Sequence, residues 1–194
     1  MSFQFEEQNI PGVFVIKPQV FGDNRGYFME TYKKEIFETY GICGEFVQDN
    51  ESCSTKGVLR GLHFQKEHTQ GKLVRVTSGS VFDVAVDVRP GSATFGQYVG
   101  VTLSSELKNM FWVPPGFAHG FLVLTDSAAF VYKCTDIYDP KSEGGIPWND
   151  PLIAVQWPKL ECEYKTSERD GKHPGFAEQS FKWAEKYLRK ETNT

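Results

Sequence analysis

Three short segments of the sequence place titratable side chains among apolar and β-branched residues, a composition typical of strands. They carry His63, His119 and Tyr132, and they comprise residues 58–65, 112–121 and 130–135. A histidine titrates near neutral pH and can accept or release a proton, whereas a tyrosine stays protonated and can donate. The residue types at these three places are therefore suited to proton transfer.

The first segment holds two polar side chains whose directions depend on the local backbone. Arg60 and His63 lie three residues apart, so a regular strand would point them to opposite faces. Gly61 lies between them and could form a β-bulge that turns one of them toward the face of the other. The alternative is that Arg60 points to solvent and that His63 is a hydrogen-bonded structural residue.

The other two segments leave similar alternatives open. His119 follows the tight turn imposed by residues 114–116 (PPG), so it would face a barrel interior or its mouth, or would only stabilise the turn. Tyr132 shares a strand face with Phe130 and Cys134. By itself, a tyrosine in that setting is more typical of core packing with a hydrogen-bonded hydroxyl than of catalysis.

The elements that must position these residues are predicted to be mostly strands. A Ser-Gly-Ser turn signal lies between residues 72–76 and residues 81–88 (VFDVAVDV). Two strand-like segments joined by such a turn predict a hairpin. Further strands are predicted at residues 13–18, 27–32, 45–51, 58–64, 98–103, 110–113, 120–124 and 128–138. Many short strands separated by turn residues predict a mainly β, antiparallel sandwich or barrel.

Helices are predicted at only two places. Residues 33–40 could form two turns that end at Gly41. Residues 176–191 keep one face largely apolar, through Phe176, Trp183 and Tyr187, which predicts a C-terminal helix. We expect this helix to pack on the outside of the β-domain, in preference to forming a dimer contact.

Length and charge exclude several classes of protein. A chain of 194 residues and 22.0 kDa fits one domain over residues 1–194. Its 21 basic and 25 acidic residues give a net charge of −4, without the basic surface of a nucleic-acid-binding protein. No apolar run is long enough for a transmembrane helix, and the N-terminal residues lack the features of a signal peptide. We therefore expect a cytoplasmic protein with no nucleic-acid or membrane partner.

The four cysteines give no indication of a zinc site. Cys43, Cys53, Cys134 and Cys162 form no Cys-x-x-Cys pair, which structural zinc sites use. In a cytoplasmic protein they are expected to be reduced thiols, most of them buried.

The segments above, with several others, resemble the dTDP-4-dehydrorhamnose 3,5-epimerase family of the cupin superfamily. The matching runs occur in order within residues 10–170. They are residues 23–28 (DNRGYF), 46–50 (FVQDN), 58–65 (VLRGLHFQ), 70–76 (QGKLVRV), 82–87 (FDVAVD), 115–121 (PGFAHGF), 132–133 (YK), 144–148 (GGIPW) and 167–170 (SERD). The ordered set is far more specific than any single run.

The resemblance implies a cupin-type double-stranded β-helix, or jelly roll, with short peripheral helices. It also implies a homodimer with exchanged N-terminal strands and a dTDP-4-keto-6-deoxy-D-glucose substrate. Cupin metal sites use a His-x-His pair followed by a glutamate, whereas this chain offers only His63 in that region. Because iron and zinc sites need about three protein ligands, we expect no metal and no other cofactor.

The resemblance also assigns roles to individual residues in an epimerisation at C3 and C5, next to a C4 ketone. It implies that His63 is the base, that Asp170 pairs with it, that Tyr132 is the acid and that Lys72 lies beside the C4 oxygen. The implied substrate-binding residues are Arg25, Glu30, Gln48, Asp49, Asn50, Arg60, His119, Glu143 and Arg169. Arg25 and Arg60 match positions on the phosphate side, where guanidinium groups suit phosphate oxygens.

Some positions match the family loosely or not at all. Arg169 stands where the family commonly has a lysine, and His68 and His173 match nothing and are expected at the surface. The alternatives to a double epimerase are an epimerase acting at one carbon, a non-catalytic sugar-nucleotide-binding domain and a metal-dependent cupin oxygenase.

Overall fold

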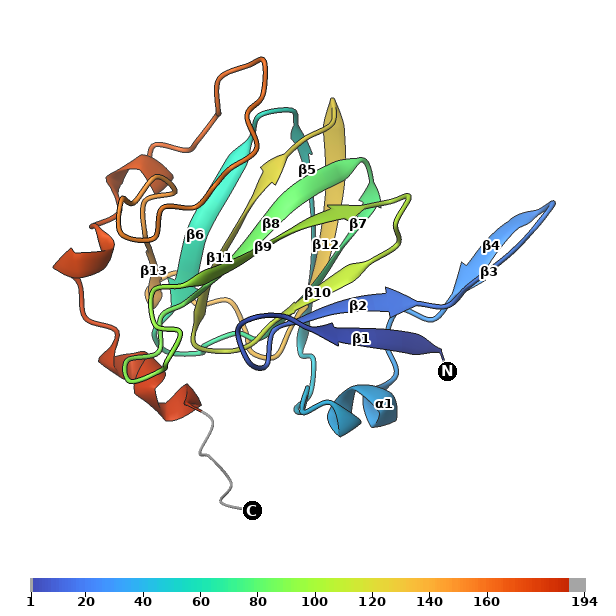
Figure 1. Cartoon of the computed structure of the whole chain (residues 1–194), viewed down its shortest axis with the longest axis horizontal. Helices are drawn as coiled ribbons and strands as arrows, with labels where there is room; N and C mark the ends of the chain where they lie inside the picture. Colours follow the sequence, from blue (N-terminus) through green and yellow to red (C-terminus); the bar gives the residue numbers. More distant parts are fainter. Residues whose placement is uncertain (1, 189–194) are drawn as a thin grey trace.

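The computed structural model describes residues 2–188, which form two antiparallel β-sheets that face each other (Figure 1). The six-stranded sheet contains, in spatial order, β1 (Phe3–Glu7), β2 (Phe14–Pro18), β10 (Met110–Val113), β7 (Lys72–Ser78), β12 (Ser127–Cys134) and β5 (Gln48–Thr55). The five-stranded sheet contains β13 (Glu143–Gly145), β6 (Leu59–Gln65), β11 (Phe117–Val123), β8 (Ser80–Asp87) and β9 (Tyr98–Ser104). This arrangement confirms the predicted mainly β jelly roll.

The main core lies between the two sheets, and the alternation of side chains along each strand decides which residues reach it. In β8, Val81 and Ala85 pack in this core, whereas Val84 and Val86 pack on the outer face of the sheet. Asp83 lies between the two inward residues and shares their face, fully buried. The strand therefore directs an ionisable side chain into an otherwise apolar interior.

The predicted hairpin between residues 72–76 and 81–88 is wrong. β7 pairs with β10 and β12, whereas β8 pairs with β9 and β11, so the two strands belong to different sheets. Gly79 makes the corner with a φ of 75°, and a side chain there would collide with the backbone of Ser127. The chain changes sheet because both strands bury apolar side chains in the same core, from opposite sides.

The outer face of the six-stranded sheet is covered by the N-terminal part of the chain. Phe37 of α1 (Lys34–Thr39) packs in one cluster with Leu73 and Trp112 of the sheet. Gly41 ends this helix with a φ of 73°, as predicted, and its N–H donates to the carbonyl of Glu38. None of the helices within residues 2–188 has the length and apolar character needed to cross a membrane.

The single C-terminal helix predicted for residues 176–191 is wrong. The chain instead forms two 3-10 helices, η2 (Phe176–Glu178) and η3 (Lys182–Tyr187), and residues 189–191 lie outside the described part. Gln179 between them is extended, and its side-chain amide donates to the carbonyls of Gly145 and Pro174. The break lets the rings of Phe176 and Phe181 stack at 5.0 Å, over the outer face of the five-stranded sheet. The segment therefore does pack outside the β-domain, as expected, but aromatic packing prevails over helix propensity.

A separate hairpin of β3 (Val20–Asp23) and β4 (Gly26–Met29) extends away from both sheets (Figure 1). Its apolar side chains are largely exposed, at 55% for Phe21, 57% for Tyr27 and 67% for Phe28. A two-stranded ribbon is marginally stable by itself, and contiguous exposed apolar side chains mark interaction surfaces. The hairpin therefore has the properties of an element that packs against a partner.

The cysteines are unpaired, but they are not mostly buried as expected. Cys134 is buried, whereas Cys43, Cys53 and Cys162 are exposed. Cys53 lies on β5 at the edge of its sheet, and alternation places it on the exposed face of that strand. Cys43 and Cys162 lie in connecting segments, which run over the surface.

Asp87 anchors the connection between β8 and β9. Its carboxylate accepts hydrogen bonds from the Arg89 guanidinium at 2.8 Å and from the hydroxyls of Ser92 and Thr94 at 2.7 Å. Its side chain is fully buried, and that of Arg89 is 6% exposed. Burial alone would raise the pKa of Asp87, but these hydrogen bonds outweigh burial and hold the pKa below its usual value.

Asp87→Asn is expected to lower the free energy of unfolding by about 3 to 5 kcal/mol at neutral pH, because it leaves the buried Arg89 charge uncompensated. The pKa of Asp87 is lower in the folded than in the unfolded chain. Its stabilising contribution is therefore complete above the unfolded value of about 4 and is lost as the pH falls through the lower folded value. Urea titrations over this range should show the difference between the two proteins shrinking with acidity. Asp23→Asn, at an exposed pair with Arg25, is the control and should change nothing measurable; an equally silent Asp87→Asn would contradict the prediction.

Candidate active site

The predicted bulge is present in β6. Gly61 and its successor stand opposite the single residue Gly120 of β11, and Gly61 has a φ of 115°. A side chain at Gly61 would collide with the backbone of β11, so only glycine fits this close approach. The extra residue brings Arg60 and His63 to the inward side of the strand. The Arg60 guanidinium there donates to the hydroxyl of Ser54, on the opposite sheet, at 3.1 Å.

His63 and Asp170 form a hydrogen-bonded dyad. Nε2 of His63 lies 2.6 Å from Oδ1 of Asp170, which belongs to the 3-10 helix η1 (Asp170–Lys172) and is 6% exposed. Burial would raise the pKa of Asp170, but the hydrogen bond and charge of His63 outweigh it, with help from the Gly61 N–H and the Ser167 hydroxyl. The pKa of Asp170 therefore lies below its usual value, and the group is a carboxylate at neutral pH. With a proton held on Nε2, the other ring nitrogen of His63, Nδ1, keeps a lone pair for a substrate proton.

Tyr132 and Lys72 reach the same interior from the opposite sheet. Tyr132 of β12 lies beside Phe130 in the main core, and Lys72 of β7 stands opposite Cys134, two residues along from Tyr132. Burial raises the pKa of Tyr132, so its hydroxyl keeps its proton and can donate. Burial lowers the pKa of Lys72, while the nearby Cys134 and Glu143 counteract part of that shift. The charge of Glu143 acts on both side chains, as it would in one shared pocket.

A second histidine–aspartate pair is buried beside the first. His119 of β11 lies opposite His63 in the ladder, and its Nε2 is 2.8 Å from Oδ1 of Asp83. Oδ2 of Asp83 is buried and has no hydrogen-bond partner among the described residues. Sequence reasoning selected His119 and missed Asp83 as a site residue. The available signal was a carboxylate on the inward face of an apolar strand, a position that demands a partner.

Glu143 and Arg169 pair close to the dyad. Their side chains form an ion pair, and the Tyr138 hydroxyl donates to Glu143 at 2.6 Å. In the ladder between β13 and β6, Gly145 lies opposite His63, so Glu143 is two residues along from the dyad. The structure thus brings both predicted residues to the site, and it adds Tyr138.

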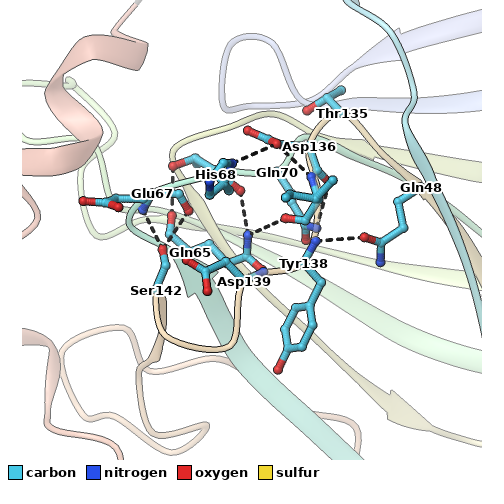
Figure 2. A network of polar contacts seen from close by, with 12 residues as sticks. Gln48, Gln65, Glu67, His68, Gln70, Thr135, Asp136, Tyr138, Asp139 and Ser142 are labelled. Atoms are coloured by element: carbon cyan, nitrogen blue, oxygen red, sulfur yellow. Dashed lines mark hydrogen bonds and ion pairs between the residues drawn. The ribbon is translucent and has the colours of Figure 1, made fainter.

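A network of polar contacts fastens the loop that carries Tyr138 to the end of β6 (Figure 2). The buried side-chain amide of Gln65 donates to the carbonyl of His68 at 2.6 Å and accepts from the N–H of Asp139 at 3.1 Å. Gln48 accepts from the N–H of Tyr138 at 2.8 Å. Figure 2 shows the Tyr138 ring projecting away from this network, so its backbone is fixed while its hydroxyl is free to reach Glu143.

β5 separates the three residues that were expected to line the nucleotide site. Asn50 lies opposite Tyr132 in the ladder, and Gln48 is two residues away on the same face. Asp49 points to the other face, where it pairs with Lys133 at 2.9 Å and is 70% exposed. Because successive side chains alternate, the structure brings Gln48 and Asn50, but not Asp49, to the side of the dyad.

Arg25 is not brought to the dyad within one chain. Arg25 lies at the tip of the hairpin of β3 and β4, where its side chain is 85% exposed and pairs with Asp23 at 2.6 Å. Its hydrogen bonds hold the pKa of Asp23 below the usual value. Glu30 follows β4 directly. Figure 1 shows this hairpin directed away from the sheets that hold the dyad.

His173 was expected at the surface but lies beside the dyad. Its Nε2 is 3.8 Å from Oδ1 of Asp170, and its ring centroid is 5.7 Å from that of His63. Burial, with the charge of His63, lowers its pKa. Gly145 makes room for the ring, because any side chain at that position would collide with it. The only signal in the sequence was a histidine three residues after Asp170. The other unmatched histidine, His68, is indeed exposed.

The interior between the sheets therefore holds groups for proton transfer on two sides. His63, oriented by Asp170, is placed to act as a base on one sheet, while Tyr132 and Lys72 offer a proton and a positive charge on the other. Such a pair can invert a carbon next to a carbonyl, because one group removes a proton and the other returns one to the opposite face. Fold and site together define an acid–base isomerase on a cupin-type jelly roll.

The chain belongs to the dTDP-4-dehydrorhamnose 3,5-epimerase family, whose model matches residues 7–178. It is 54% identical over 170 residues to the dTDP-4-dehydrorhamnose 3,5-epimerase of Methanothermobacter thermautotrophicus, covering 87% of this chain and 92% of that relative. A crystal structure of dTDP-6-deoxy-D-glucose-3,5-epimerase from Legionella pneumophila, in complex with dTDP-4-keto-L-rhamnose, matches with a TM-score of 0.90 and 48% identity. That match covers 93% of this chain and 96% of the Legionella chain. The chain is accordingly an epimerase.

A single-site epimerase of the same fold is more distant. The structure of a 3′-monoepimerase from Streptomyces bikiniensis, in complex with dTDP-quinovose, matches with a TM-score of 0.82 and 33% identity, over 88% of this chain and 87% of that chain. The higher identity to the 3,5-epimerases favours action at two carbons over action at one.

Proposed function

We propose that this chain epimerises dTDP-4-dehydro-6-deoxy-D-glucose at C3 and C5 to give dTDP-4-dehydro-L-rhamnose. The observation that carries the proposal is the dyad of His63 and Asp170, which opens into the same interior as Tyr132 and Lys72. The substrate is inferred from the relatives named for this reaction, one of them solved with dTDP-4-keto-L-rhamnose.

In the proposed reaction, the C4 ketone acidifies the protons at C3 and C5. Nδ1 of His63 takes one of these protons, and Asp170 stabilises the imidazolium that forms. The electron pair of the broken C–H bond moves to the C4 oxygen, where the charge of Lys72 stabilises the enolate. Tyr132 then returns a proton to the opposite face of the carbon, and solvent restores both groups. The same sequence at the second carbon completes the double epimerisation.

The substrate's diphosphate and nucleotide require fixed positive charge and hydrogen-bonding groups nearby. Arg60 lies on the inward side of β6 close to His63, which fits a phosphate contact. Gln48 and Asn50 line the neighbouring face of β5, and the pair of Glu143 and Arg169 lies at the edge of the pocket. We assign these residues to substrate binding, with His119 as a further contact.

We propose that the enzyme is a homodimer in which the hairpin of β3 and β4 reaches the partner's site. Support comes from the exposed apolar side chains of this hairpin and from Arg25, which matches a substrate-binding position but lies at the exposed tip of the hairpin, directed away from the sheets that hold the dyad. Glu30, which follows β4 directly, is assigned to the same arm. A twofold dimer would place each arm at the other subunit's pocket. Asp49, on the outward face of β5, has no such explanation, and we leave it out of the site.

Mixing two inactive variants tests the exchanged arm. Arg25→Ala lacks the arm's charge, and His63→Ala lacks the base, so each homodimer should be strongly impaired. In a mixed dimer, the subunit with an intact His63 receives an intact Arg25 from its partner. Co-expression should therefore restore up to about a quarter of the wild-type sites, from random pairing. Analytical ultracentrifugation establishes that dimers form, and dimers without restored activity would contradict the exchange.

The reaction itself is tested by NMR of dTDP-4-keto-6-deoxyglucose in D₂O with the purified protein. The proposal expects deuterium at both C3 and C5 and formation of the L-rhamno product. Deuterium at one carbon alone would identify a single-site epimerase. Deuterium at neither carbon would contradict the proposal for this substrate.

We further propose that residues 1–194 form one domain that works in the cytoplasm. The strands of both sheets share one core, and four unpaired cysteines fit a reducing compartment.

A further inference from the structure

The cluster of His63, Asp170 and His173 contains more than a proton-transfer dyad requires. One nitrogen or oxygen atom of each residue lies within 4.8 Å of the other two. The side chain of His173 is 10% exposed, and its Nε2 is buried with no hydrogen-bond partner within the described part of the chain. A buried ring nitrogen without a partner is costly, and this one faces the carboxylate of Asp170.

We propose that this cluster is a binding site for a divalent transition-metal cation, Zn²⁺ by its ligand chemistry, which inhibits the enzyme. Two imidazoles and one carboxylate form a ligand set that zinc accepts, with the fourth position left to water. Among divalent cations, imidazole ligands favour zinc and copper over magnesium and calcium. The proposed ion is a reversible inhibitor and has no part in the epimerisation.

Of the two distances from Oδ1 of Asp170 to the histidine nitrogens, one is shorter and one longer than the separation of ligand atoms in a zinc site. Bonds of about 2.0–2.1 Å in a tetrahedral site separate neighbouring ligand atoms by about 3.3 Å. Oδ1 of Asp170 is 2.6 Å from Nε2 of His63 and 3.8 Å from Nε2 of His173. Shifts of well under 1 Å would bring both of these distances to that value, and the ligand atoms of the two histidines lie within 4.8 Å of each other. The ring of His173 is held close by the space that Gly145 leaves, as described above.

The position of the ion explains why it would inhibit. Zinc would bind the lone pair of Nε2 of His63, the nitrogen that now lies 2.6 Å from Asp170. The neutral ring has a single N–H proton, which must then sit on Nδ1, the atom proposed to accept the substrate proton. This inhibitory effect rests on the proposed role of His63, whereas metal binding itself does not.

The test begins with chelator-treated protein titrated with ZnCl₂ alone. Equilibrium dialysis with metal analysis should find one tight zinc per chain, and deuterium exchange at C3 and C5 should fall in parallel and recover with excess chelator. His173→Gln should keep the basal activity, because this residue takes no part in proton transfer, and should weaken zinc binding at least about tenfold, as loss of one of three ligands implies. His68→Gln is the matched control, since His68 pairs with Asp136 at the surface, and it should leave binding unchanged.

A measurement on the wild-type protein guards against a variant that fails to fold. The chain has four histidines, and zinc should shift the imidazole NMR signals of His63 and His173 while leaving those of His68 and His119 in place. Zinc taken up without any change in those two signals, for example by the exposed thiols, would overturn the proposal, as would equal binding in His173→Gln. One zinc held through His173 without loss of exchange would overturn the inhibitory mechanism. A protein that binds zinc in this way but has no epimerase activity would contradict the proposed function and leave the metal site supported.

Discussion

His63→Ala is expected to lower epimerisation by at least about 10³-fold and to abolish deuterium incorporation at both C3 and C5. The reason is that one ring is proposed to serve both carbons. Of the two histidines beside the dyad, His119 is paired with the buried Asp83, and His173 has its Nε2 buried. Binding of dTDP should remain largely intact, because the groups assigned to the nucleotide and diphosphate lie on β5 and at Arg60. NMR in D₂O measures exchange, and isothermal titration calorimetry measures dTDP affinity.

The matched control for this variant is His68→Ala. His68 is also paired with an aspartate, Asp136, but the pair is exposed and lies in the loop network outside the pocket. It should retain wild-type exchange at both carbons. Near-normal turnover in His63→Ala would show that another group is the base. Loss of exchange at one carbon only would show that two different bases serve the two carbons.

The side-chain directions in the site could be predicted where they depend on local backbone geometry, such as a bulge or the alternation of a strand. The glycine between Arg60 and His63 indicated a bulge, and the structure has that bulge at Gly61. The direction of Tyr132 also followed from strand alternation. The same rule was available for Asp49, which stands between Gln48 and Asn50 and must point the other way. Asp49 was nevertheless predicted to bind substrate, because residues 46–50 match the family as one continuous motif.

What the sequence could not supply were contacts between distant parts of the chain. The strands on either side of Gly79 look like a hairpin, because the turn residues between them are a local signal. They belong to different sheets because both bury side chains in the shared core. Likewise, periodicity predicted a helix after Phe176, whereas the packing of Phe176 against Phe181 required an extended residue between them. His173 became a neighbour of His63 only through the fold, although the two are 110 positions apart along the chain.

Tyr132→Phe is expected to separate the two halves of the reaction. Removal of a proton by His63 and its return to the same face exchange hydrogen for deuterium without inversion. Inversion requires a proton from the other face, and Tyr132 is the protonated group there, because burial raises its pKa. We expect net epimerisation to fall by about 10²-fold, the scale of one general acid, while exchange falls by less than about tenfold.

Both rates come from one time course in D₂O, in which loss of the proton signals reports exchange and appearance of the L-rhamno product reports inversion. Tyr164→Phe is the control, since the hydroxyl of Tyr164 only donates to the carbonyl of Pro158, and it should change neither rate. An equal fall in exchange and inversion would mean that Tyr132 stabilises the enolate and is not the acid. Enolate stabilisation is the role proposed for Lys72, so Lys72→Met should slow exchange and inversion together. The tyrosine variant is compared with that pattern.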